Sequence, residues 1–167
     1  MEFKVKASTI YACSLERAFK TPMLCDISKV HTGFIVMPAI THCAGDEHWG
    51  KPGYSKTCFA AKSLLFGGGE VSSDTVLERV ENQYWKIQVA DFKMNMIGFT
   101  RFVGEWQTTE LAPGQVRIDY TYTLHADMPV LYPLNWLFAK TFWRIYMGRV
   151  LENIRQMTYH EEPYQYD

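Results

Sequence analysis

The chain has 167 residues, of which 47% are hydrophobic, 15% aromatic and 21% charged, and its formal net charge is −1. This length is typical of one domain with its own core, so we expect a single domain over residues 1–167. A net charge near zero provides no general basic field, which argues against a nucleic acid partner. The totals fit a soluble globular protein with an unusually large share of aromatic side chains.

The first residues predict a strand rather than an export signal. Residues 3–12, FKVKASTIYA, alternate polar and apolar side chains and contain no continuous apolar stretch. The spacings of the four cysteines, Cys13, Cys25, Cys43 and Cys58, match no zinc or redox motif. Because nothing indicates export, we interpret these residues as reduced thiols and expect a cytoplasmic protein.

Two short helices are predicted directly after this strand. Ser14 can cap a helix over residues 14–21, with Glu16 in the first turn, where the helix dipole favours a carboxylate. Pro22 is expected to end this helix and to begin a second one over residues 22–30.

A long region of strands separated by turns follows the two helices. Turn residues at 45–53, GDEHWGKPG, and at 112–115, APGQ, divide it. The clearest strand is 116–126, where one face is apolar and carries Val116, Ile118, Tyr120, Tyr122 and Leu124. This alternation indicates an antiparallel sheet with one covered face. About six such strands form hairpins, so the order of elements predicts an α+β fold with its helices on one side of the sheet.

The last predicted element is a long helix over residues 130–157. Lys140, Arg144 and Arg149 interrupt its apolar sequence, so no transmembrane segment is expected. The second half is amphipathic, whereas the first half is apolar nearly all round. One face should pack on the sheet, and the other, around Phe138, needs a loop, a second subunit or a membrane surface as cover.

The position of Lys140 allows two interpretations. In a straight helix, Lys140 falls close to the middle of the apolar stripe that carries Trp136, Trp143 and Met147. Either the helix kinks, starts later or lets the side chain reach its edge. Alternatively, Lys140 lies in an interior cavity, where its charge requires an anionic ligand or a carboxylate partner.

Three stretches of the sequence resemble the START-like, or helix-grip, superfamily and its polyketide cyclase/dehydrase and lipid-transport (SRPBCC) group. Residues 10–30 contain a strand that leads into S-x-E-x-x-F and then an aspartate, here Ser14, Glu16, Phe19 and Asp26. Residues 99–124 resemble the paired late strands of this group, and residues 148–157 resemble the end of its long helix.

This resemblance implies a curved antiparallel sheet wrapped around a long C-terminal helix, with two short helices after the first strand and a cavity between sheet and helix. Members bind hydrophobic or aromatic small molecules, and some cyclise or dehydrate polyketides. The group has no shared catalytic motif, so the resemblance assigns no catalytic residue to this chain.

The aromatic residues form either a ligand pocket or a filled core, and the resemblance favours the pocket. The polar tips of tyrosines, and Lys140 or Arg144 for an anionic ligand, would orient the bound molecule. The residues expected to contact a ligand are Tyr11, Trp85, Trp106, Tyr120, Tyr122, Trp136, Lys140 and Trp143.

A metal site is not expected. His42, Asp46, Glu47 and His48 are close in sequence, but three of them lie at a predicted hairpin tip and their spacing matches no known site. We interpret this segment as a solvated turn and expect no metal and no cofactor.

The first functional hypothesis is therefore non-covalent binding of a hydrophobic or aromatic small molecule. The second is a cyclase- or dehydratase-like enzyme that uses the same cavity. It requires an acid–base pair there, such as His31, His125 or a carboxylate beside a tyrosine. The third is an interaction module, in which the C-terminal helix forms a homodimer or touches a membrane.

Overall fold

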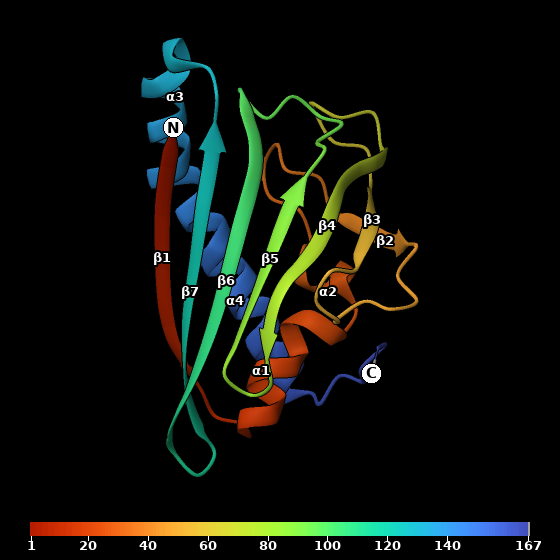
Figure 1. The fold of residues 1–167 in the computed structure, drawn as a ribbon, viewed down its shortest axis with the longest axis vertical. Helices are drawn as coiled ribbons and strands as arrows, with labels where there is room; N and C mark the ends of the chain where they lie inside the picture. The colour runs from red at the N-terminus through yellow and green to blue at the C-terminus, as the bar shows by residue number, and fades with distance from the viewer. Residues whose placement is uncertain (167) are drawn as a thin grey trace.

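The computed structural model describes residues 1–166, which form one sheet and a set of helices (Figure 1). The strands are β1 (Glu2–Tyr11), β2 (Ile40–Ala44), β3 (Ser55–Ala60), β4 (Gly69–Val80), β5 (Tyr84–Ala90), β6 (Phe99–Ala112) and β7 (Gln115–Ala126). The helical segments are α1 (Leu15–Leu24), α2 (Ile27–Val30), η1 (Pro129–Leu131), α3 (Tyr132–Leu137), η2 (Phe138–Trp143) and α4 (Arg144–Tyr159).

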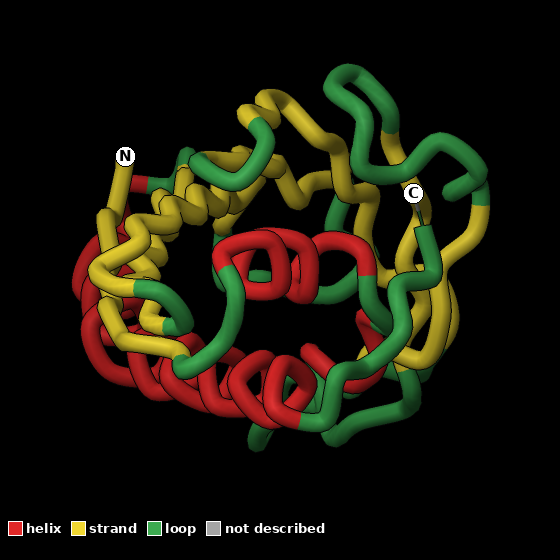
Figure 2. Tube along the Cα trace, turned by 90° about the horizontal axis from the view of Figure 1, so that it is seen from below, coloured by secondary structure: helices red, strands yellow, loops and turns green. Residues whose placement is uncertain are grey.

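The seven strands form a single antiparallel sheet in the order β1-β7-β6-β5-β4-β3-β2. Strands β2 to β6 each pair with the next strand along the chain, β7 also pairs with β1, and only the connection through α1 and α2 joins opposite edges. Viewed from below, the sheet arches over the helices (Figure 2). The predicted α+β fold, a curved antiparallel sheet around a long C-terminal helix, is confirmed.

The core lies between the concave face of the sheet and α4. Val116, Ile118, Tyr120, Tyr122 and Leu124 of β7 are all buried, as their alternation predicted. The helix contributes its own buried face against them, with Tyr146, Met147, Val150, Leu151, Ile154 and Met157. Burial of one large apolar side chain is worth about 1.5–3 kcal/mol, so this shared layer is the main source of stability.

The predicted break at Pro22 was wrong, because Pro22 lies inside α1. A proline has no N–H to donate to the carbonyl four residues earlier, which leaves the Ala18 carbonyl without its usual partner. The indole Nε1 of Trp106 donates to that carbonyl at 3.2 Å. The second helix is therefore shorter than predicted and begins after Asp26, whose carboxylate accepts from the backbone N–H of Ser28 at 2.9 Å.

The C-terminal helix is continuous but not uniformly α-helical, since its η2 segment is π-helical. A π-helical turn has one extra residue between hydrogen-bonded partners. The residues before it are therefore rotated by about one position, roughly 100°, relative to a straight α-helix. Asn135 and Ala139 are buried where a straight helix would bury Trp136 and Lys140.

The outer side of this helix is only partly covered. Phe142 stacks on Phe138 with ring centroids 5.0 Å apart, and Phe34 from the loop before β2 lies 5.2 Å from Phe142. A loop therefore covers this part of the predicted surplus apolar face. Ile145 remains 56% exposed.

Gly104 of β6 lies directly opposite Tyr122 of β7. A β-carbon at Gly104 would lie 2.9 Å from Cζ of Tyr122 and 3.1 Å from its hydroxyl oxygen, which is closer than van der Waals contact permits. The Tyr122 ring can therefore occupy its inward position only because residue 104 has no side chain.

We expect Gly104→Ala to lower the free energy of unfolding by about 1–3 kcal/mol, because the added methyl group forces Tyr122 out of its place. Urea unfolding followed by circular dichroism measures this loss. The matched control is Gly148→Ala on the exposed side of α4, where a β-carbon meets no atom within 4 Å. It should stabilise the helix by up to about 1 kcal/mol. Equal effects of the two substitutions would contradict the proposed steric role of Gly104.

Candidate functional site

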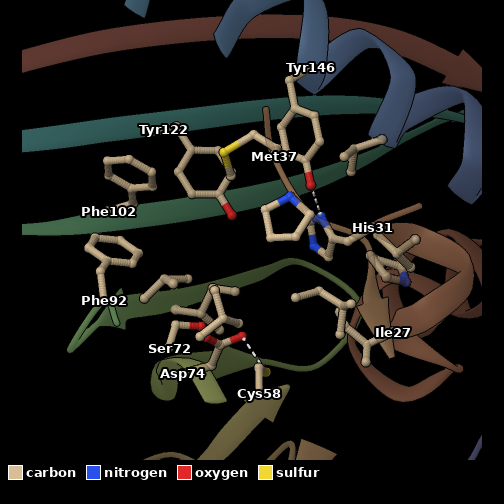
Figure 3. A pocket seen from close by; sticks show the side chains of 18 of the residues that line it. Ile27, His31, Met37, Cys58, Ser72, Asp74, Phe92, Phe102, Tyr122 and Tyr146 are labelled. Atoms are coloured by element: carbon tan, nitrogen blue, oxygen red, sulfur yellow. Dashed lines mark hydrogen bonds between the residues drawn. The ribbon is translucent and has the colours of Figure 1, made fainter. Parts of the chain in front are cut away.

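A cavity of about 100 Å³ lies between the concave face of the sheet and the C-terminal helix. Figure 3 shows side chains from three sides pointing toward it: Tyr122 from the sheet, Tyr146 from the helix and Ile27 from the short second helix. The loop from α2 to β2 contributes His31, Met37 and Pro38 to its wall. Elements far apart in the sequence therefore meet at one cavity.

An aromatic cluster forms much of the wall. The rings of Tyr120 and Tyr122 meet edge to face at 5.2 Å, and Tyr122 meets Trp143 of the helix in the same way at 5.1 Å. Phe102 lies 4.7 Å from Trp143, and Trp85 lies 6.4 Å from Tyr120. These contacts hold the rings in fixed orientations, because edge-to-face packing is the favoured arrangement of aromatic pairs.

The structure brings four of the eight predicted ligand contacts to the cavity: Trp85, Tyr120, Tyr122 and Trp143. Tyr11 and Trp106 are buried but do not line it. The Tyr11 hydroxyl donates to the Leu151 carbonyl at 2.6 Å, which fastens the end of β1 to α4. Trp106 fastens α1 to the sheet through its bond to Ala18. Both residues therefore have structural roles beside the cavity.

Trp136 and Lys140 lie outside the cavity. Trp136 is 48% exposed, and the ammonium group of Lys140 donates to the backbone carbonyl of Lys4 at 3.2 Å on the surface. The π-helical segment turns both side chains away from the interior, so the interpretation that placed Lys140 in a cavity was wrong. Arg144 is likewise exposed.

His31 is the histidine that lines the cavity. Its Nδ1 lies 2.8 Å from the hydroxyl of Tyr146, and Figure 3 shows the two side chains pointing at one another from the loop and the helix. Burial, with a smaller contribution from the Lys56 charge, lowers the pKa of His31 to about 4. The imidazole is therefore neutral at neutral pH. His125 lies on the outer face of the sheet, where its Nδ1 is 3.3 Å from the Glu2 carboxylate.

A buried carboxylate, Asp74 of β4, stands in the wall near the sheet edge (Figure 3). It accepts from the Ser72 hydroxyl at 3.1 Å and from the Cys58 thiol at 3.4 Å. Burial raises the pKa of Asp74, although the Lys56 charge and the two hydrogen bonds oppose that increase.

A buried cation, Lys56 of β3, lies directly across from this carboxylate on the neighbouring strand. It is 2% exposed and is the direct cross-strand partner of Asp74. Its ammonium group lies 3.9 Å from the ring centroid of Trp49, an arrangement in which the negative ring face attracts the cation. Lys56 itself does not line the cavity and lies behind the wall that Asp74 forms, where the Trp49 ring holds its positive charge.

Among the buried polar atoms of the described residues that have no hydrogen-bond partner, two belong to residues that line the cavity. They are the indole Nε1 groups of Trp85 and Trp143. An unpaired buried N–H costs about 1–3 kcal/mol, so a molecule that accepts from either group would gain that energy.

Asp74 and Tyr146 were not predicted as site residues. Tyr146 follows Trp143 by three positions on one helix face, which is a usable signal. The sequence contains no comparable signal for Asp74. Polar side chains lie on both faces of β4 near it, since Ser73 and Thr75 are its neighbours.

The histidines and Asp46 of residues 42–48, for which no metal was expected, contact other side chains. The His42 ring stacks on Phe59 at 4.6 Å, the His48 ring meets Tyr54 at 4.9 Å, and the Asp46 carboxylate accepts from the Tyr166 hydroxyl. Residues 1–166 contain no group of three or more His, Cys, Asp or Glu side chains arranged for a metal. None of their helices is long and apolar enough to cross a membrane.

No protein-family model and no curated protein matches the sequence. Solved structures do match. Ara h 8.0201 superposes with a TM-score of 0.68 at 13% identity over 96% of this chain and 99% of its own. A START superfamily protein from Mycobacterium smegmatis gives 0.66 at 15% identity, covering 92% and 97% of the two chains. Norcoclaurine synthase from Thalictrum flavum, in complex with dopamine and hydroxybenzaldehyde, gives 0.64 at 9% identity, covering 98% and 90%.

These similarities extend over nearly the whole length of both chains, while the identities are too low to carry more than the fold. In this chain they include the antiparallel sheet, the two short helices after β1 and the long C-terminal helix. The chain has the START-like, helix-grip fold that its sequence resembles.

Proposed function

We propose that this protein binds an aromatic or other hydrophobic small molecule non-covalently in the cavity between the sheet and the C-terminal helix. The observation that carries the proposal is an interior space lined mainly by apolar and aromatic side chains and by a few polar groups, which is the usual character of a ligand pocket. Removal of apolar ligand surface from water, worth roughly 25 cal/mol per Å² before ordering costs, would drive binding.

The size of the cavity restricts the ligand. At about 100 Å³ it is smaller than pockets for drug-sized molecules, which have roughly 300–1,000 Å³. An engineered cavity of about 150 Å³ binds benzene, so a single aromatic ring is the upper limit of the scale here and requires a small outward shift of the wall. The single-ring compounds in the norcoclaurine synthase complex are of that scale. Larger ligands would displace the flexible methionines in the wall, which are Met23, Met37, Met94 and Met96.

The polar groups would orient the ligand. The His31–Tyr146 pair lies on one side and Asp74 on another, while the indole donors of Trp85 and Trp143 are available to an acceptor. A ring with a hydroxyl or carbonyl substituent therefore fits better than a pure hydrocarbon. We further infer from the sequence that the protein acts in the cytoplasm as a single domain over residues 1–167.

Ile87→Trp is expected to weaken the binding of phenol and hydroxybenzaldehyde by at least about tenfold, equivalent to about 1.4 kcal/mol, because the larger side chain fills the cavity. Titration followed by ligand-observed NMR measures the affinity. The control is Gln88→Trp, the next residue of β5, which points to the outer face of the sheet. If neither probe binds the unsubstituted protein, or if both substitutions weaken binding equally, the proposed site is wrong.

General acid–base catalysis on a carbonyl compound is a second candidate function. It is favoured by the inward position of His31 beside Tyr146 and by the buried carboxylate of Asp74. Burial lowers the pKa of His31 and raises the pKa of Asp74, so their environments separate a base from an acid. The contact with Tyr146 uses Nδ1, which leaves Nε2 of His31 to remove a proton beside a ligand carbonyl.

If His31 acts as a base, the protein should accelerate the exchange of the methyl protons of acetophenone in heavy water, as followed by NMR. With a pKa of about 4, the neutral imidazole dominates at both pH 7 and pH 5.5, so the rate should stay nearly constant between them. An ordinary histidine would lose about tenfold over that interval. His31→Asn retains a group that can bond to Tyr146 but removes the base, and it should abolish the acceleration. Equal rates for the two proteins would exclude this role.

A further inference from the structure

Two cysteines lie side by side at the edge of the sheet next to the cavity. Cys43 of β2 and Cys58 of β3 are direct cross-strand partners in the antiparallel register. Both are free thiols, and their sulfur atoms are 2.8 Å apart. Cys58 also lines the cavity, and its thiol donates to the Asp74 carboxylate at 3.4 Å.

This arrangement is close to the geometry of a disulfide. A disulfide requires a sulfur–sulfur distance of about 2.05 Å, so the two atoms need to approach by less than one ångström. The strand pairing fixes both backbones, which means that side-chain rotation alone must close the gap. The other two cysteines have different surroundings: the Cys25 thiol donates to the Glu162 carbonyl at 3.5 Å, and Cys13 stands beside Thr158.

We propose that Cys43 and Cys58 form a reactive dithiol site, which exchanges with small-molecule disulfides such as oxidised glutathione and closes into a cross-strand disulfide in the cavity wall. The proposal concerns the thiols themselves and does not depend on which ligand, if any, occupies the cavity.

The two thiols have unequal environments, which assigns their roles. Cys43 is partly exposed on the edge strand β2, whereas Cys58 is only 2% exposed. The contact with Cys58, together with the nearby Lys56 charge, lowers the pKa of Cys43, although burial opposes that decrease. The same contact and burial raise the pKa of Cys58. Cys43 is therefore the attacking thiolate and Cys58 the resolving thiol, since the thiolate is the nucleophilic form.

The exchange proceeds in two balanced steps. First, the Cys43 thiolate attacks one sulfur of oxidised glutathione, which forms a mixed disulfide and releases one glutathione thiolate. Second, the Cys58 sulfur attacks the Cys43 sulfur of the mixed disulfide, and the Cys58 proton passes to the departing glutathione sulfur. The second glutathione therefore leaves as a thiol. Two electrons pass from the protein thiols to the glutathione disulfide, and two glutathione molecules result.

Closure of the bond would change the cavity as well as the sheet edge. The oxidised pair has no S–H to donate to Asp74, so that buried carboxylate loses one of its two side-chain hydrogen bonds. Oxidation therefore alters the polar side of the cavity without moving an element of the sheet.

The test is to incubate the reduced, folded protein with oxidised glutathione, to alkylate the remaining thiols, and to analyse intact and digested protein by mass spectrometry. We expect the loss of two alkylatable thiols of the four and a peptide pair that links Cys43 to Cys58. The matched control, Cys13→Ser with Cys25→Ser, should still lose both of its remaining thiols. If that variant folds poorly, the peptide map of the unsubstituted protein decides alone.

Single substitutions separate the two steps. Cys58→Ser should stop at a mixed disulfide with glutathione on Cys43, because the resolving thiol is absent. Cys43→Ser should react more slowly, because the remaining thiol is buried. Full alkylation of Cys43 and Cys58 after incubation with oxidised glutathione would overturn the proposal. So would stable glutathione adducts on both residues, or a disulfide that involves Cys13 or Cys25.

Discussion

The phase of the C-terminal helix determines which side chains face the interior of this protein. The concave sheet provides one wall of the cavity, but the opposite wall depends on how the helix is rotated about its own axis. The π-helical segment at 138–143 sets that rotation. Its extra residue per turn rotates the helical residues that precede it relative to those of α4. Trp143 and Tyr146 point inward in the phase of α4, while the shift turns Lys140 to the surface.

That rotation also determines the electrostatics of the cavity. With Lys140 and Arg144 outside, the polar groups that reach the cavity come mainly from the sheet edge and from the loop after α2. Asp74 and Lys56 are neighbours across β3 and β4, and an aromatic ring accommodates the ammonium group. His31 remains neutral through burial. Buried polar groups of this kind are costly unless they are paired. Their concentration around one small space is therefore hard to attribute to stability alone.

The sequence could predict the sheet and about half of the aromatic wall, because both depend on local periodicity. Alternation in 116–126 identified Tyr120 and Tyr122 as inward residues, and the pattern of elements predicted the fold. Two features of the cavity wall could not be predicted from periodicity. A π-helical turn interrupts the period on which a helical wheel depends, which misplaced Trp136 and Lys140. In β4, polar residues occur on both faces, so alternation could not separate the inward Asp74 from the outward Thr75.

The pairing of Cys43 with Cys58 could not be predicted from the sequence either. Cys43 and Cys58 are separated by a long hairpin connection, and their spacing in sequence matches no dithiol motif. Only the strand register makes them partners, and register depends on the turn and on both neighbouring strands. The pairing of β3 with its other neighbour, β4, places Lys56 opposite Asp74. Strand β3 therefore carries one partner of the thiol pair and one partner of the Lys56–Asp74 pair, and the reactivity of the thiols depends on the charges beside them.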